Sequence, residues 1–311
     1  GDGFYTAKNP PFGAVFNYHL KDELKSIKKQ RQQAEKKATK DKKTNKLPSW
    51  DALESELNEL GPYIWLVIKD DTGHVVRRVK GSAKKGFNQV AWDLSYPDML
   101  VVEEKPPEAG NATNFLALPG EYSASLVKEQ AGQFTNLSDP QKFQVKRLKK
   151  GALDGAEPEV LIAFWKRLSG TLREIMITDS KITKAIKRND QMQRALARST
   201  SMPGKLDQEL HAIRSDLKNI SKALNGHEAK NEIGEKASQV SVYDRFFAAF
   251  YGTIFSTYGP TPTHLNAIDL AETELKTLQQ SLQKLVKETI PAFEEKLYQS
   301  GAPWVADGMI Q

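Results

Sequence analysis

The chain has 311 residues, with 45 Lys and Arg against 39 Asp and Glu, and it contains no cysteine. This length predicts two or three compact units, and a hydrophobic content of 39% is sufficient for packed cores. The lack of cysteine excludes a disulfide scaffold, a cysteine nucleophile, and thiolate-bound zinc or iron–sulfur centres. We expect no cofactor.

The positive charge is concentrated in one segment. Between Lys21 and Lys46 there are 11 basic and 4 acidic residues, a local net charge of +7, whereas the rest of the chain carries 34 basic and 35 acidic residues. The basic character therefore describes one surface segment. It does not indicate a nucleic-acid-binding protein.

Residues 1–20 predict the first strand of a sheet. After the stiff Pro10-Pro11 pair, the side chains of Phe12, Ala14, Phe16 and Tyr18 lie on one parity, which is typical of a strand. The chain starts without Met and without the pattern of a secretion signal, which is typical of an excised or processed fragment.

Residues 21–60 predict a Lys-rich helical insert between two strands. Good helix formers with few large apolar side chains extend from Lys21 to about Asn45, and a second helix restarts near Trp50 with Ser49 as its N-cap. We expect both helices to be mostly exposed to solvent.

Residues 61–150 predict an antiparallel β-sandwich of immunoglobulin-like size. Short runs of β-forming residues are separated by Gly- and Pro-containing turns, a spacing typical of this architecture. The predicted strands are 63–68, 74–79 after a hairpin turn at 70–73, 86–93, 119–126 and 142–145.

Residues 157–300 predict an antiparallel helix bundle, followed by a tail at 301–311. The apolar period changes from two to about three and a half past Gly151, with seams that begin at Leu161, Leu206 and Leu265. A further apolar helix is expected at about 235–256, and Pro291 predicts a kink in the last helix. No strand of the sheet is expected within 157–300.

The sequence shows no motif that indicates an active site. It lacks a phosphate-binding glycine loop and a nucleophile elbow, and in the zinc-protease-like run His227-Glu228-Ala229-Lys230-Asn231 an Asn replaces the second His. Sequence neighbours point apart in helices and strands, so adjacent carboxylates favour turns, loops and solvated faces over a glycosidase pair. These pairs are Asp70-Asp71, Glu103-Glu104 and Glu294-Glu295. We predict no catalytic residue and no metal site.

The basic run supplies the candidate binding residues. They are Lys28, Lys29, Lys36, Lys37, Lys42 and Lys43. A solvated helix is the favoured interpretation, while binding of phosphate, nucleic acid or an anionic glycan is the alternative. Aromatic residues are not interleaved with these lysines, so base stacking is unsupported.

Aromatic residues of the predicted sheet raise a second alternative. Trp65, Trp92 and Tyr122 are candidates for a sugar-binding platform, but their parities favour a place in the sandwich core.

Three segments together resemble the immunoglobulin-like module of flagellar hook-capping proteins and of many exported bacterial proteins. These segments are Asp70-x-x-Gly73-x-Val75-Val76-Arg77, Gly86-x-Asn88-x-Val90-x-Trp92-Asp93 and Pro119-Gly120-x-Tyr122. The Pro-Gly corner is expected to direct the Tyr122 hydroxyl toward backbone.

The flanking segments resemble those that follow the β-propeller in bacterial sortilin-like, Asp-box-repeat proteins, which are often labelled glycosyl hydrolases. They are Asn9-Pro10-Pro11-Phe12-Gly13-Ala14-x-Phe16-x-Tyr18-x-Leu20, Ser256-Thr257-Tyr258-Gly259-Pro260-Thr261-x-Thr263 and Gly301-Ala302-Pro303-Trp304. The resemblance covers nearly the whole chain and implies a propeller upstream. No Asp-box pattern occurs in the chain itself, so a glycosidase label is transferable to none of its residues.

The resemblance implies a non-catalytic C-terminal accessory or docking region of an exported bacterial protein, in the periplasm, at the outer membrane or outside the cell. Its partner is then its own upstream β-propeller. A module that binds a glycan, another envelope protein or an envelope polymer is the alternative, and a hydrolase in its own right is less favoured. Glycines and prolines interrupt the longest stretch without charged residues, 246–268, so no membrane span is expected.

Overall fold

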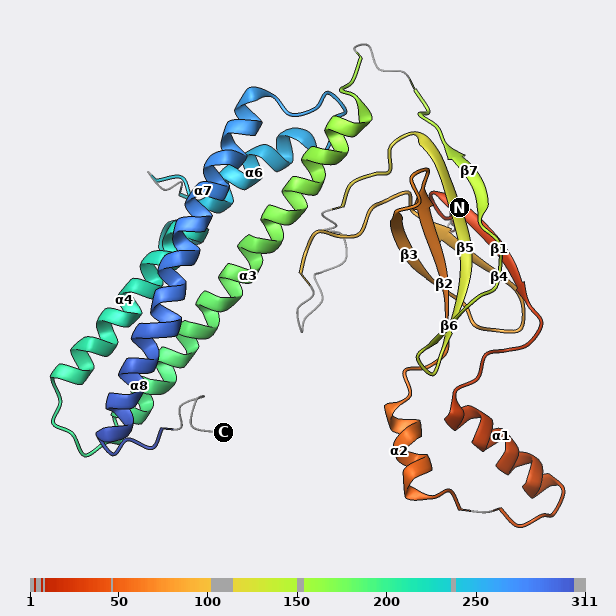
Figure 1. Ribbon diagram of the computed structural model, residues 1–311, viewed down its shortest axis with the longest axis horizontal. Coiled ribbons are helices and arrows are strands. Elements are labelled where there is room, and N and C mark those ends of the chain that lie inside the picture. Colours follow the sequence, from red (N-terminus) through yellow and green to blue (C-terminus); the bar gives the residue numbers. More distant parts are fainter. Residues whose placement is uncertain are drawn as a thin grey trace. The chain divides into compact units, whose positions relative to one another are not determined.

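The structure, a computed structural model, describes residues 3, 7, 9–45, 47–101, 114–149, 154–235 and 239–304. The chain divides into two compact units (Figure 1). The first consists of Gly1–Asp98 and Asn114–Lys150, and the second of Met99–Thr113 and Gly151–Gln311. Antiparallel sheets with short helices form the first unit, and several packed helices form the second.

The first unit contains two antiparallel sheets. One sheet pairs β1 with β4, and the other has the order β3-β2-β5-β6, with β7 also paired to β5. The strands are β1 (Ala14–Leu20), β2 (Tyr63–Asp70), β3 (Val75–Gly81), β4 (Gly86–Trp92), β5 (Gly120–Gln130), β6 (Gln133–Asn136) and β7 (Gln141–Val145). The sequence did not predict the short, exposed β6.

Side chains from both sheets fill one core cluster. Trp92 of β4 is fully buried, and its ring lies 5.4 Å from Tyr122 of β5 and 6.0 Å from Phe143 of β7. The indole Nε1 of Trp92 donates to the Ser95 carbonyl at 2.9 Å, which satisfies the polar atom of this large apolar group. Burial of Trp92 and Tyr122 is therefore confirmed.

The first strand also joins this core. Tyr18 and Leu20 of β1 are buried, and Phe16 packs against the cluster. The prediction of an alternating strand is confirmed, except that Phe12 precedes the strand and is 68% exposed. Gly13 has φ of 109°, and a Cβ there would lie 1.9 Å from the Trp92 carbonyl oxygen, so only glycine fits this position.

Two short helices separate β1 from β2. They are α1 (Ile27–Lys40) and α2 (Trp50–Asn58), and neither contains a buried residue. Ser26 and the predicted Ser49 cap their N-termini, since each hydroxyl accepts a hydrogen bond from a backbone N–H of the first turn. We call residues 21–60 the arm, which projects from one end of the sheets in Figure 1.

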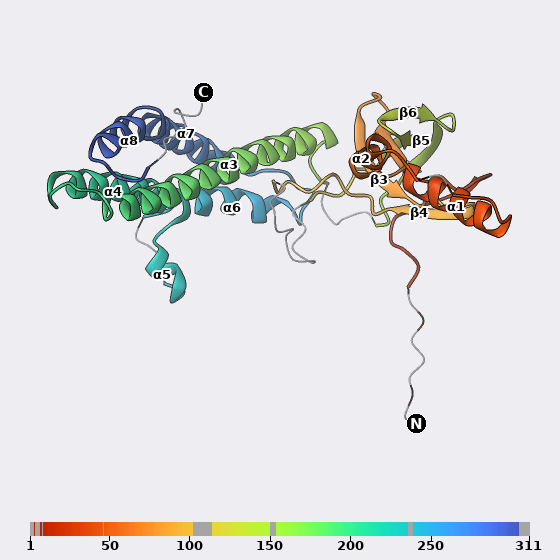
Figure 2. The ribbon, with the colours of Figure 1, turned by 90° about the horizontal axis from the view of Figure 1, so that it is seen from below.

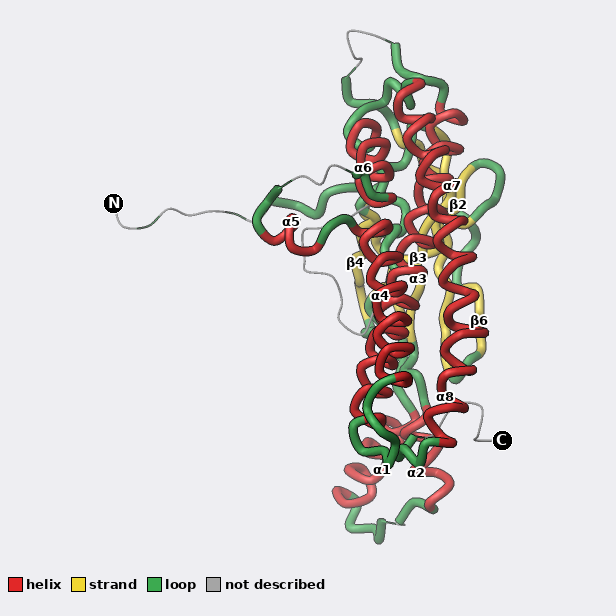
Figure 3. Tube along the Cα trace, turned by 90° about the vertical axis from the view of Figure 1, so that its left-hand side faces the viewer, coloured by secondary structure: helices red, strands yellow, loops and turns green. Residues whose placement is uncertain are grey.

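The second unit is helical. Its helices are α3 (Pro158–Leu196), α4 (Lys205–Asn225), α5 (Glu228–Glu232), α6 (Val242–Thr253), α7 (Pro262–Lys284), the π-helical turn η1 (Leu285–Thr289) and α8 (Ile290–Gln299). Figure 3 shows α3, α4 and α7 side by side, with α8 continuing the line of α7, and Figure 2 shows α5 standing away from them. Within the described part of 157–300, no residue pairs into a sheet, as predicted.

Two details of this unit differ from the sequence prediction. The helix expected at about 235–256 is shorter, because α6 begins only at Val242, where Ser241 and Asp244 form a capping box. Leu265, predicted for the last seam, is 39% exposed. Just before Pro291, where a kink is predicted, the helix contains a wider, π-helical turn, η1. Proline clashes with the carbonyl four residues earlier, and a π-helical turn relieves that clash.

Candidate functional site

The predicted lysines lie on the arm and remain on the surface. Lys28, Lys29, Lys36 and Lys37 belong to α1, while Lys42 and Lys43 follow its last turn, and all six are exposed. Lys29 donates to Glu23 at 2.6 Å. An open hollow beside α1 is lined by Gln32, Glu35, Lys36, Thr39 and Lys40. The six lysines thus contribute to an exposed cationic surface.

The predicted core position of Trp65 is wrong. Ile64, Leu66 and Ile68 fill the core from β2, so period-two alternation turns Trp65 to the outer face of the sheet. There the Arg78 guanidinium lies 4.5 Å from the ring centroid, and the indole Nε1 donates to Glu129 at 2.6 Å. Since a cation already stacks on the ring, Trp65 is not a free platform for a sugar.

The adjacent carboxylate pairs were predicted in turns, loops or solvated faces, and this prediction is correct for Asp70-Asp71 but not for Glu294. Asp70 and Asp71 lie at the β2–β3 turn, where Asp70 accepts hydrogen bonds from the hydroxyl and the backbone N–H of Thr72. Burial tends to raise the pKa of Asp70, but the hydrogen bonds from Thr72 and His74 outweigh it and lower that pKa. Glu103-Glu104 lies outside the described residues.

Glu294 of the third pair is not on a solvated face. It is 2% exposed and accepts two hydrogen bonds from Arg188, at 2.6 and 2.8 Å. No group of three or more metal-ligating side chains occurs among the described residues.

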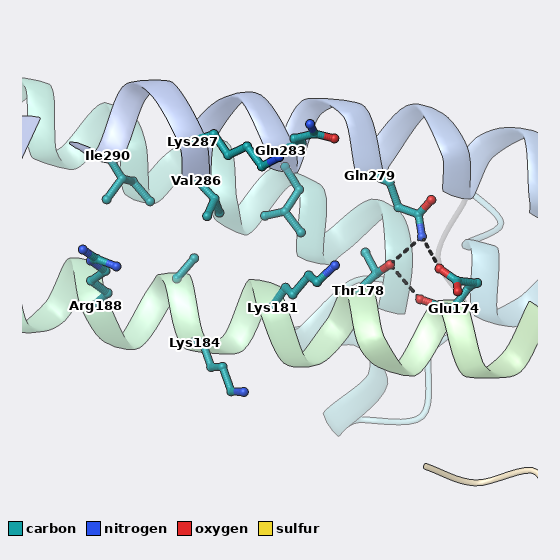
Figure 4. A pocket seen from close by; sticks show the side chains of 12 residues that line it. Glu174, Thr178, Lys181, Lys184, Arg188, Gln279, Gln283, Val286, Lys287 and Ile290 are labelled. Carbon is teal, nitrogen blue, oxygen red and sulfur yellow. Dashed lines mark hydrogen bonds between the residues drawn. The ribbon is translucent and has the colours of Figure 1, made fainter. Parts of the chain in front are cut away.

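A groove of about 510 Å³ lies between α3 and the segment from α7 to α8 (Figure 4). At one end, the Gln279 amide of α7 donates to Glu174 at 3.0 Å and to Thr178 at 3.1 Å, both on α3. At the other end, Arg188 of α3 and Glu294 of α8 form the bidentate pair. Glu174 of the first bridge and Arg188 of the second are fourteen positions apart on α3, a helical distance of about 21 Å.

The groove between these bridges is apolar at its base and cationic at its rim. Ala185, Leu282, Val286 and Ile290 line it together with Lys181, Lys184 and Lys287. The three lysines are exposed and have no ion-pair partner within the described part of the chain. Such a lining offers positive charge and apolar contact, which suits an acidic and partly apolar ligand.

An aromatic stripe runs along α6 and the residues after it in the helical unit. Tyr243, Phe247 and Tyr251 stack at four-residue intervals, with ring centroids 5.5 and 5.2 Å apart. Tyr251 is 61% exposed and Phe255 is 86% exposed. The adjacent side of α6 holds Phe246 and Phe250 in the core, and the Phe247 ring contacts both of them. Tyr243 and Phe247 are therefore half-buried, while Tyr251 and Phe255 remain exposed. We call Tyr243, Phe247, Tyr251 and Phe255 the aromatic stripe.

The residues that follow Phe255 are held in place by contacts with the start of the helical unit. The Thr257 carbonyl accepts a hydrogen bond from the Ala156 N–H at 2.8 Å, and Gly259, with φ of 85°, lies close against Ala156. Thr261 then caps α7, with Pro262 in its first turn. The 256–263 motif singled out in the sequence is therefore the connection between α6 and α7. The sequence of α6 could have revealed the stripe, because its aromatic residues recur at a helical period in two rows.

Comparison with known proteins identifies no relative, because no family model, curated protein or solved structure matches the sequence. None of the described helices is both long and apolar enough to span a bilayer.

Proposed function

We propose that this chain is a non-catalytic accessory region that docks onto another folded protein domain through its helical unit. The aromatic stripe carries the proposal. Aromatic side chains are enriched in the buried centres of protein interfaces, because they supply large apolar contact area with few rotatable bonds. Phe255 and Tyr251 leave most of their surfaces in water, an unfavourable state that a docked partner relieves.

The groove supports the same proposal. Its lysine rim, Lys181, Lys184 and Lys287, complements an acidic segment of a partner, and charge complementarity steers and orients association.

The proposed partner is the upstream β-propeller that the resemblance to sortilin-like, Asp-box-repeat proteins implies, in an exported bacterial protein. We also propose that the two sheets are an immunoglobulin-like sandwich and that the helices are an antiparallel bundle. The hydroxyl of Tyr122 donates to the Leu118 carbonyl at 2.9 Å, the backbone-directed contact of a tyrosine corner, which supports the first assignment.

The test is a calorimetric titration of this chain with the propeller segment of its own gene product. Phe255→Asp is expected to weaken binding by about 30-fold or more, the scale of a hot-spot side chain. Phe87→Asp is the matched control, because Phe87 is equally exposed at 89% but lies on β4 of the other unit. Equal affinity of the Phe255→Asp variant and the parent contradicts the docking site, and a parent gene without a propeller contradicts the partner.

The absence of catalysis is tested separately. We expect the chain to hydrolyse no glycoside, peptide or phosphate ester. A single Glu or Asp whose neutralisation lowers a measured rate about 100-fold or more, with the fold intact, identifies a general acid or base and refutes the proposal.

A further inference from the structure

The arm exposes four large apolar side chains within fourteen residues. Leu47 is 95% exposed, Trp50 is 86%, Leu57 is 84% and Leu60 is 74%. Such values mean that each side chain stands out separately and makes few contacts with its neighbours. An isolated helix as short as α2 is marginal in water, and amphipathic helices normally gain their stability by covering an apolar face. In α2, that face is uncovered at Trp50 and Leu57, while Leu53 is half-buried.

The two helices of the arm are held together by polar contacts. Arg31 of α1 binds both carboxylate oxygens of Glu56 on α2, at 2.5 and 2.9 Å, and the Ile27 N–H donates to Glu59 at 2.6 Å. Pairing of the start of α1 with the end of α2 makes the helices antiparallel. These contacts fix the line along which the helices meet.

Helix geometry then decides which side chains share a side of the arm. Each residue turns about 100° around its helix. Measured from the contact line through Arg31 and Glu56, Lys28 and Lys36 of α1 turn to the same side as Leu53 and Leu57 of α2. The pKa of Glu56, lowered mainly by its hydrogen bond from Arg31, is lowered further by the nearby charge of Lys28, consistent with this placement.

The far end of the arm combines the same chemistry. Lys36, Lys37 and Lys40 lie in the last turns of α1, Lys42 and Lys43 follow, and Leu47 and Trp50 come next. The apolar side chains thus directly follow a run of cations that have no ion-pair partner among the described residues.

We propose that the arm is a peripheral membrane-binding element that inserts Leu47 and Trp50 into the interface of an anionic bilayer while its lysines contact the lipid headgroups. In the arm the lysines come from α1 and the turn after it, and the exposed Trp and Leu come from α2 and the residues before it. Cationic side chains close to exposed Trp and Leu are typical of elements that lie in such an interface. Clustered lysines are attracted to anionic lipid surfaces. A bilayer accepts separate protruding side chains without a complementary shape, whereas a folded protein requires a matching surface.

The experiment measures partition of the whole chain onto vesicles by flotation. Two compositions are compared, phosphatidylcholine alone and phosphatidylcholine with 30% phosphatidylglycerol, on the order used to create an anionic surface. We expect binding only to the anionic vesicles, weakened by 0.5 M salt, on the order at which surface charges are screened.

Two sets of variants separate the apolar and electrostatic contributions. Leu47→Ser with Trp50→Ser, and Lys36, Lys37, Lys42 and Lys43 each changed to Gln, are each expected to lower the partition coefficient. The lysine set should lower it roughly 25-fold, since each lysine near an anionic surface contributes about fivefold and at least two of the four reach it. Because no arm helix contains a buried residue, these variants should melt like the parent.

Matched controls locate the effect. Phe87→Ser with Phe134→Ser removes two exposed apolar side chains of the sheets, and four exposed lysines of the helical unit are changed to Gln. Those lysines are Lys166, Lys205, Lys276 and Lys284. Both control variants should bind vesicles like the parent.

Each other result overturns the proposal. Failure of the parent to bind anionic vesicles does so directly, and so does equal loss of binding in the controls. Loss in the lysine variant alone, with the Leu47 and Trp50 variant unaffected and heparin competing, indicates a soluble anionic polymer. A parent dimer that becomes monomeric on changing Leu47 and Trp50, without vesicle binding, indicates that a second copy covers the arm.

Discussion

The arm and the helical unit are both built from amphipathic helices, yet only the helices of the helical unit bury apolar residues. Along α3 and α4, Leu168, Ile175, Leu217 and Leu224 are fully buried, whereas α1 and α2 have no buried residue. Apolar periodicity therefore predicts where a helix forms and which face is apolar. It does not tell whether that face meets the protein's own core or an external partner.

The largest expected effect separates a buried tryptophan from an exposed one. Trp92→Ala removes the fully buried ring between the two sheets, and we expect a loss of about 3 to 5 kcal/mol in the free energy of unfolding, as for other large core truncations. Chemical denaturation measures it. A Trp92→Ala variant that unfolds like the parent contradicts the shared core.

The ion pair between buried Glu294 and half-buried Arg188 should have the next largest effect. Arg188→Gln leaves the 2%-exposed Glu294 without its bidentate partner, and a buried group left without its hydrogen bonds costs about 1 to 3 kcal/mol. Replacement of both residues by Leu is the control, since it removes the uncompensated charge. If the double variant is no more stable than the single one, the pair is not the cause.

Acidification should weaken the helical unit through Glu272. Burial tends to raise the pKa of Glu272, but hydrogen bonds from Arg167 and Thr171 hold it below the ordinary 4.5. The folded state therefore releases this proton more readily, and its contribution to stability is complete above the ordinary pKa and is lost as pH falls through the lowered one. Below about pH 5 the melting temperature of the parent should fall more steeply with pH than that of the Glu272→Gln variant. Equal pH dependence of the two melting temperatures contradicts this role of Glu272.

The smallest effect is expected on the arm. Trp50→Ala changes the same residue type as Trp92→Ala, but Trp50 is 86% exposed, so its loss should alter the unfolding free energy by about 0.5 kcal/mol or less. A large destabilisation measured in the same denaturation series indicates that Trp50 packs against the protein in solution.

Much of the fold follows from local signals in the sequence. Alternation placed Tyr18, Trp92 and Tyr122 in the core, Ser49 was identified as a helix cap, and the seams of α3 and α4 were predicted from their period. Trp65 was misplaced because its β-forming run has apolar residues on both sides, and only cross-strand neighbours decide which side faces the core.

The candidate surfaces were less accessible to sequence reasoning. The lysines of the arm were evident from composition, but the uncovered state of Trp50 and Leu57 depends on what packs against α2 in three dimensions. The groove likewise depends on residues of α3 and α7 that lie about a hundred positions apart in the sequence. Glu294 was expected on a solvated face, because no local pattern indicates its partner, Arg188.

Amide hydrogen exchange of the whole chain tests the central contrast most directly. Exchange through local opening reports how well each helix is stabilised by packing. We expect the amides of α1 and α2 to exchange after openings that cost little free energy, while those in the middle of α3 and α4 require opening close to global unfolding. Protection of α2 equal to that of α4 would show that Trp50 and Leu57 are covered in solution and would contradict the account of an arm that awaits a partner.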